Sequence, residues 1–145
     1  MNKTTWIHPF LLFALLTPPF ASSQEKQADG VLFRLTQEKE TDPRWMKIQV
    51  CSDDIIRVIA SREQSPSTRP SLMVDKTSWE PVHWSVHEKD GQTVITTTEL
   101  SIQVDAKSGS VAFLDAAGKL LLKEHAGGGK IFTAADVMGE KTWHI

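Results

Sequence analysis

The sequence lacks the features on which several common classes of small protein depend. Its 145 residues contain one cysteine, Cys51, so the chain cannot form an internal disulfide. It has no repeats, and its formal net charge of -2 gives no reason to expect nucleic acid or an anionic membrane surface as a partner. Its longest apolar run, residues 10–16, is shorter than the roughly 18 residues of a membrane span. Core packing must therefore stabilise the fold, and an apolar content of 40% is sufficient for it.

The first residues have the pattern of a secretory signal peptide. Met1–Lys3 is a short positive segment, Phe10–Leu16 is apolar, and Ala21–Ser23 places small residues where a signal peptidase cleaves. No cysteine stands at this site, which excludes a lipoprotein anchor. We expect residues 1–23 to be removed and the chain to be exported to the periplasm or the extracellular space, without membrane attachment after cleavage.

The central segment, residues 93–123, has the pattern of an antiparallel meander. Alternation of apolar and polar residues from Leu100 to Val104 indicates a strand with one buried face, and β-branched residues extend this strand upstream to Thr93. Turn residues follow at 105–109 and again at 116–118. Further strands are therefore predicted over residues 110–114 and 119–123.

The rest of the mature chain continues in short runs of the same kind, after a polar tail over residues 24–30. Strands are predicted over residues 31–35, 45–50, 55–59, 72–74, 81–86 and 141–145. No stretch has sustained helical periodicity. Many short strands separated by turn signals predict an all-β protein, an antiparallel β-sandwich over residues 31–145.

Four segments, in their order along the chain, carry a resemblance to a known family. They are Met46–Val58, a strand, an acidic turn and an Arg-Val strand, followed by Ser71–Val74, Phe113–Lys119 and Gly139–Ile145. Together they resemble the N-terminal domain of glycoside hydrolase family 31. Ser71–Val74 is most similar to the α-xylosidase-like members.

The resemblance implies a galactose mutarotase-like β-sandwich that stands before a (β/α)8 catalytic barrel. In that family two carboxylates of the barrel carry out retaining hydrolysis of α-glycosides, as in α-xylosidases and α-glucosidases. A barrel needs about 250 residues, and the family's nucleophile segment, Trp-x-Asp-Met-Asn, has no counterpart here. The chain is then a non-catalytic domain whose partner is the C-terminal barrel and whose ligand is an oligosaccharide substrate. Because the sequence ends at Ile145 within an alternating run, we expect a fragment and a sandwich incomplete at its C-terminal end.

Two other functions remain open at this stage. One is an autonomous secreted carbohydrate-binding or structural β-module. The other is a small mutarotase-like enzyme, which needs a positioned acid and base.

The acidic and histidine residues offer no pair that could perform such chemistry. Neighbours on a strand point to opposite faces, so Asp53–Asp54 is interpreted as a turn. His83 and His87 share a strand face but lie about 13 Å apart at 3.3 Å per residue, too far for one metal ion. His125 and His144 have no partner recognisable from the sequence. We assign no catalytic residue, no metal and no cofactor.

Two further motifs are interpreted as structural. Gly127–Lys130 suggests a phosphate-binding loop, but Glu124 and Ile131 stand where that motif requires Gly and Ser or Thr, so the segment is interpreted as a flexible link. Cys51 has no acid or base nearby and is interpreted as a buried or half-buried structural thiol.

Three tryptophans are candidates for contact with a flat apolar sugar face. Trp84 alternates with Val82 and Val86 and is predicted to belong to the core. Trp79 lies in a loop-like segment and is the candidate for carbohydrate binding, although an interface with a barrel suits it equally. Trp45 begins a strand and is left undecided.

The signal peptide leads to a direct prediction. Exported from a secreting bacterial host, the protein should begin at Gln24 or within a residue or two of it, because the small residues at the cleavage site end there. Intact-mass measurement checks this, and exported protein that retains Met1 would contradict it.

Overall fold

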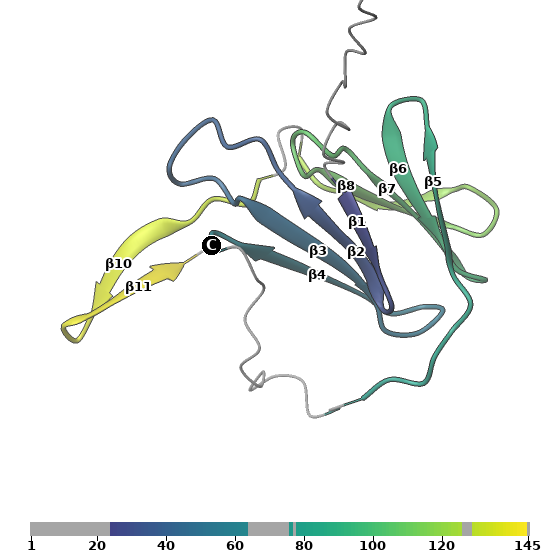
Figure 1. Ribbon diagram of the computed structural model, residues 1–145, viewed down its shortest axis with the longest axis horizontal. Helices are drawn as coiled ribbons and strands as arrows, with labels where there is room; N and C mark the ends of the chain where they lie inside the picture. The colour runs from purple at the N-terminus through teal and green to yellow at the C-terminus, as the bar shows by residue number, and fades with distance from the viewer. Residues whose placement is uncertain (1–23, 64–75, 77, 126–128, 145) are drawn as a thin grey trace, which may run out of the picture.

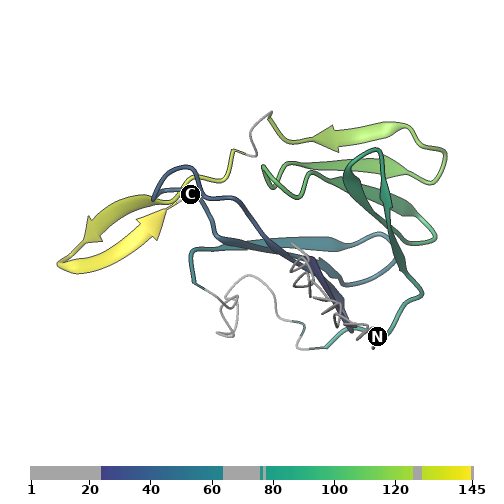
Figure 2. The ribbon, with the colours of Figure 1, turned by 45° about the horizontal axis from the view of Figure 1, so that its top comes forward.

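Two antiparallel sheets form the body of the molecule, and they pack face to face (Figure 2). The computed structural model describes residues 24–63, 76, 78–125 and 129–144. The predicted signal peptide and the predicted strand over residues 72–74 lie outside these residues. No helix occurs in the described chain, and hence no helix long and apolar enough to cross a membrane. The all-β antiparallel sandwich is confirmed.

Each sheet is a meander in which neighbours in sequence are neighbours in space (Figure 1). The four-stranded sheet has the order β1 (Gln24–Gln27), β2 (Gly30–Arg34), β3 (Trp45–Val50) and β4 (Ile56–Ser61). The five-stranded sheet has the order β5 (Ser85–Lys89), β6 (Gln92–Thr96), β7 (Leu100–Val104), β8 (Val111–Asp115) and β9 (Leu120–Lys123). A separate hairpin of β10 (Thr133–Val137) and β11 (Glu140–His144) projects away from the sandwich.

The core lies between the two sheets and follows the alternation of the sequence. In the four-stranded sheet every second residue of β2 and β3 points inward, so that Phe33, Met46 and Ile48 are fully buried. Ile95 and Ile102, which are register partners in the other sheet, are also fully buried and belong to the same cluster. Burial of these side chains supplies the stabilisation that no disulfide can.

The predicted polar tail over residues 24–30 is instead an ordered edge strand and turn. β1 pairs with β2 through its backbone, which needs no apolar side chains. The side chain of Gln24 reaches the other sheet, where it accepts a hydrogen bond of 2.6 Å from the Thr93 hydroxyl. The Asp29 carboxylate lies 2.8 Å from the Lys47 ammonium. Burial opposes ionisation of Asp29, but the hydrogen bond and charge of Lys47 outweigh it and lower the pKa of the carboxyl below its usual value.

The prediction of a single strand over residues 93–104 is wrong, because a tight turn divides this segment into β6 and β7. Thr97 makes this turn: its N–H donates to the Leu100 carbonyl, and its hydroxyl oxygen accepts from the Leu100 N–H at 3.0 Å. The same hydroxyl donates to the Asp53 carbonyl at 2.6 Å and thereby joins the β3–β4 turn to the β6–β7 turn. Threonine favours strands by composition, and its role as a turn residue was not visible in the pattern.

The other turns of the central meander are confirmed. Asp90 and Gly91 both have positive φ, of 52° and 76°, as a two-residue hairpin requires. The turn over residues 105–109 is closed by a 2.8 Å hydrogen bond from the Gly109 N–H to the Asp105 carbonyl, and the turn over residues 116–118 by one from the Gly118 N–H to Asp115.

Two predicted strands differ from the structure in extent. The strand predicted over residues 81–86 begins only at Ser85, because Pro81 cannot donate to a ladder and the chain runs irregularly up to β5. The lone strand predicted over residues 141–145 is one arm of the β10–β11 hairpin, whose turn at Met138 and Gly139 has φ values of 56° and 84°. Positive φ is uncommon for Met, so this turn carried little signal in the sequence.

We expect replacement of Thr97 by Val to destabilise the fold by about 1–3 kcal/mol, because it leaves the Asp53 carbonyl and the turn N–H groups without their partner. Thr98→Val is the matched control, since Thr98 is exposed in the same turn. Urea unfolding followed by tryptophan fluorescence measures both. Equal stabilities of the two variants would contradict the role assigned to Thr97.

Candidate functional site

The acidic pair Asp53–Asp54 is a structural turn, as predicted. The Asp53 side chain accepts a hydrogen bond from the Thr98 N–H at 3.3 Å, and the Asp54 carboxylate accepts one from the Ser52 hydroxyl at 2.7 Å. The Asp54 carboxylate therefore bonds within its own turn, and the Asp53 carboxylate bonds to the β6–β7 turn. The two do not converge on a common point as an acid and base would have to do.

The histidines are dispersed over the surface. His83 and His87 are exposed, the first before β5 and the second within it. Contrary to expectation, His125 has an interaction partner, and it lines a hollow between the β2–β3 loop and the β7–β8 turn. The side chain of His144 lies outside the described part of the structure. Within that part, no three His, Cys, Asp or Glu side chains are grouped as metal ligands.

Cys51 is buried, with 2% of its surface exposed, as the structural interpretation predicted. Burial raises the pKa of its thiol. The nearby charge of Arg57 lowers this pKa, but its effect is smaller than that of burial. A thiol that is both buried and protonated is a poor nucleophile.

Lys130 has a structural role. Its ammonium group pairs with the Glu124 carboxylate and donates a 3.0 Å hydrogen bond to the Gly109 carbonyl. Glu124 also accepts from the Val111 N–H at 3.1 Å. The lysine thus joins the segment after β9 to the β7–β8 turn. Gly127 and Gly128 of the predicted link lie outside the described residues.

Cations cover three of the four described tryptophans. The Lys76 ammonium lies 4.5 Å from the ring centre of Trp79, the carbohydrate-binding candidate, which is half-buried rather than open. The Lys26 ammonium lies 4.6 Å from the ring centre of Trp84, which packs against the core as predicted. Arg62 covers Trp143 at 3.8 Å. Among the described residues, no cation lies over the fourth ring, that of Trp45.

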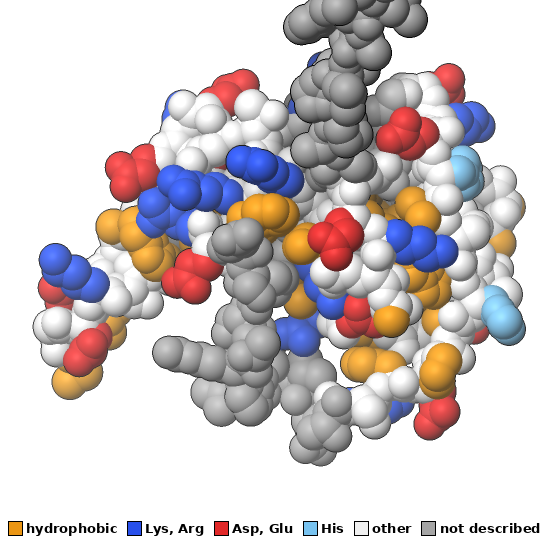
Figure 3. Space-filling model, viewed as in Figure 1, with side chains coloured by type: hydrophobic (Ala, Val, Ile, Leu, Met, Phe, Trp, Pro, Cys, Tyr) orange, Lys and Arg blue, Asp and Glu red, His pale blue; other side chains and the backbone are white. Residues whose placement is uncertain are grey.

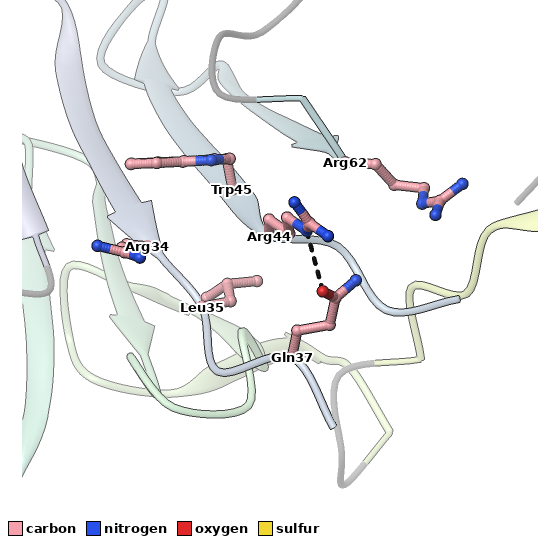
Figure 4. A pocket seen from close by; sticks show the side chains of 6 residues that line it. All are labelled: Arg34, Leu35, Gln37, Arg44, Trp45 and Arg62. Atoms are coloured by element: carbon pink, nitrogen blue, oxygen red, sulfur yellow. Dashed lines mark hydrogen bonds between the residues drawn. The ribbon is translucent and has the colours of Figure 1, made fainter. Parts of the chain in front are cut away.

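Trp45 lies instead in a cavity of about 540 Å³ at the end of the four-stranded sheet (Figure 4). The cavity is lined by Arg34, Leu35, Gln37, Arg44, Trp45 and Arg62. Trp45 and Arg34 are register partners on β3 and β2, so their side chains emerge side by side. The Arg44 Nε donates to the Gln37 side-chain oxygen at 2.9 Å, which holds this guanidinium at the cavity.

Antiparallel topology gathers the three arginines. Arg34 ends β2, Arg44 immediately precedes β3, and Arg62 immediately follows β4. In a meander, the end of one strand lies beside the start of the next, so these positions meet at one end of the sheet. Figure 3 shows Lys and Arg side chains gathered in this region, where the β10–β11 hairpin leaves the sandwich. The cluster was not predicted from the sequence, although a basic residue beside one end of each of three successive strands was the available signal.

Comparison with known proteins identifies the fold and the family. Residues 46–144 match the family described as the glycosyl hydrolase 31 N-terminal galactose mutarotase-like domain. The chain belongs to this family. The resemblance seen in the sequence is therefore confirmed.

Solved structures of family 31 enzymes share the fold. An α-xylosidase from Xanthomonas citri is 29% identical over 81% of this chain, with a TM-score of 0.68. A dextranase from Flavobacterium johnsoniae, solved with isomaltotriose, is 22% identical over 77% of this chain, with a TM-score of 0.58. The chain covers only 12% and 13% of those two proteins. It thus corresponds to a small part of each.

We expect Cys51 to be protected from thiol reagents in the folded family 31 domain, because it is buried and its raised pKa disfavours the thiolate. Its reaction with Ellman's reagent near neutral pH should be at least about a hundredfold slower in buffer than in denaturing urea, where the thiol is exposed. Comparable rates in the two conditions would show that Cys51 is accessible.

Proposed function

We propose that the chain is the non-catalytic N-terminal domain of an exported α-glycosidase of the α-xylosidase type. In this role it supports the catalytic barrel and contributes to the wall of the oligosaccharide pocket. The observation that carries the proposal is the likeness to the Xanthomonas citri α-xylosidase, which exceeds the likeness to the dextranase in both identity and TM-score.

The chemistry of the described residues supports a non-catalytic role. Retaining hydrolysis requires two carboxyl groups about 5 Å apart on a rigid frame. The adjacent acidic side chains, Asp53 and Asp54, instead bond within and between turns, and the cavity beside Trp45 is lined by arginines. A domain with these features can hold or position a sugar without cleaving it.

The outer edge of the five-stranded sheet supports docking against a further domain. β9 is an edge strand, and Leu120, Leu121 and Leu122 are 54%, 55% and 62% exposed. Ile131, after β9, is 53% exposed. Consecutive exposed leucines on a free edge are unfavourable for an isolated monomer. Contact with another domain of the same enzyme would cover them.

The decisive experiment is to read the DNA downstream of codon 145. A continuing frame that encodes a barrel and its two carboxylates supports the proposal. A stop codon in the native gene, with no barrel encoded, favours an autonomous binding module instead.

The purified chain should show no glycosidase activity by itself, since the carboxylate pair belongs to the barrel. An assay with aryl α-xylosides and α-glucosides tests this. Turnover that persists through a second, independent purification would overturn the non-catalytic assignment.

The isolated chain should self-associate through β9. Leu122→Lys should reduce the association, because a charge on an edge strand opposes pairing with another chain. Met138→Lys is the matched control, since Met138 is 99% exposed at the tip of the β10–β11 hairpin, away from β9. Light scattering over a concentration series measures both variants. A wild-type chain that stays monomeric at high concentration would contradict this prediction.

A further inference from the structure

The cavity at the end of β2, β3 and β4 has an excess of positive charge that the described residues leave largely uncompensated. Arg34 is exposed and makes no ion pair within the described chain, and Arg44 bonds to the neutral amide of Gln37. Arg62 makes a long contact of 3.5 Å with Glu40, a carboxylate whose side chain is 87% exposed. The two exposed guanidinium groups of Arg34 and Arg44 at one cavity therefore attract an anion.

Arg62 lines the cavity, but its guanidinium points away from Trp45 (Figure 4) and packs over the ring of Trp143 at 3.8 Å. Its Nε is buried and has no hydrogen-bond partner among the described residues. The guanidinium groups open to a ligand are therefore those of Arg34 and Arg44, which are both exposed. Arginine is also the side chain best suited to hold a planar carboxylate through paired N–H groups.

Trp45 indicates what kind of molecule carries the anion. Its ring borders the cavity, no cation of the described chain lies over it, and Arg34 emerges beside it on the neighbouring strand (Figure 4). An aromatic ring next to a guanidinium suits a ligand with a flat apolar face and a carboxylate at its edge. A uronic acid residue has this combination, whereas inorganic sulfate or phosphate has only the charge.

We propose that this cavity binds an acidic sugar, with the arginines holding the uronate carboxyl group and Trp45 contacting the sugar ring. The site lies on the domain itself and needs no catalytic residue. That the cavity binds an anion rests on the cavity alone, and that the anion belongs to a sugar rests also on the proposed function.

The test is a titration of the full chain, at concentrations where it is monomeric, followed by tryptophan fluorescence. The probes are a xylo-oligosaccharide that carries glucuronic acid, the matching neutral xylo-oligosaccharide, and sodium sulfate. The variants are the double substitution Arg34→Gln/Arg44→Gln and the single substitution Trp45→Leu. Arg57→Gln is the control, because Arg57 is exposed on β4 of the same sheet and does not line the cavity. Circular dichroism confirms that each variant folds.

We expect the acidic oligosaccharide to bind at least about tenfold more tightly than the neutral one, with an affinity that falls as salt rises. Arg34→Gln/Arg44→Gln should remove this preference, Arg57→Gln should keep it, and Trp45→Leu should weaken sugar binding without affecting sulfate. Equal binding of the two sugars, absence of binding, or sulfate binding as tight as uronate binding would each overturn the proposal. A different result would contradict the proposed function, namely downstream DNA that encodes no barrel, so the two proposals can be overturned separately.

Discussion

The structure depends on burial of two apolar sheet faces against each other. Cys51 has no partner for a disulfide, so burial of side chains such as Phe33, Met46 and Ile102 must supply the stability of the fold. Because apolar and polar residues alternate along the strands, each sheet is apolar on the face that packs against the other sheet. A shift of one residue in the pairing of a strand would turn its apolar side chains to the opposite face. Two hydrogen bonds between the sheets then fix their relative position. The Thr93 hydroxyl donates to the Gln24 side chain, and the Thr97 hydroxyl donates to the Asp53 carbonyl where two turns meet.

The parts of the fold that follow from local chemistry could be predicted from the sequence. Asp90-Gly91 and the turn ending at Gly109 carry residues that readily adopt positive φ, and the structure has turns there. The Thr97 turn was missed because threonine is a strand residue by composition and becomes a turn residue only through hydrogen bonds of its hydroxyl. β1 was missed for the opposite reason, since Glu25 and Lys26 are polar and its pairing with β2 uses backbone groups, which leave no pattern in side chains.

The candidate site was harder to predict because it exists only after the strands are paired. Arg34, Arg44 and Arg62 are far apart in the sequence, and each is unremarkable beside its own strand. They meet only because β2, β3 and β4 are neighbours in this order and run antiparallel. The sequence predicted the β3–β4 hairpin, but it did not predict the pairing of β2 with β3. Trp79 was predicted from its loop position as the candidate for carbohydrate binding, and its ring lies beneath Lys76. Which side chains cover a ring depends on the folded structure and cannot be seen in the sequence.

The third arginine of the cavity links it to the projecting hairpin. The Arg62 guanidinium packs over the ring of Trp143 on β11, at 3.8 Å, while its Nε remains without a partner. A cation–π contact of this kind is worth about 0.5–1 kcal/mol at an exposed site, enough to favour one position of a long side chain. Phe132, just before β10, donates its N–H to the Thr41 carbonyl at 2.8 Å, which ties the base of the hairpin to the β2–β3 loop next to the cavity. The stacking of Arg62 on Trp143 and the hydrogen bond between Phe132 and Thr41 thus join the hairpin to the end of the four-stranded sheet at which the cavity lies.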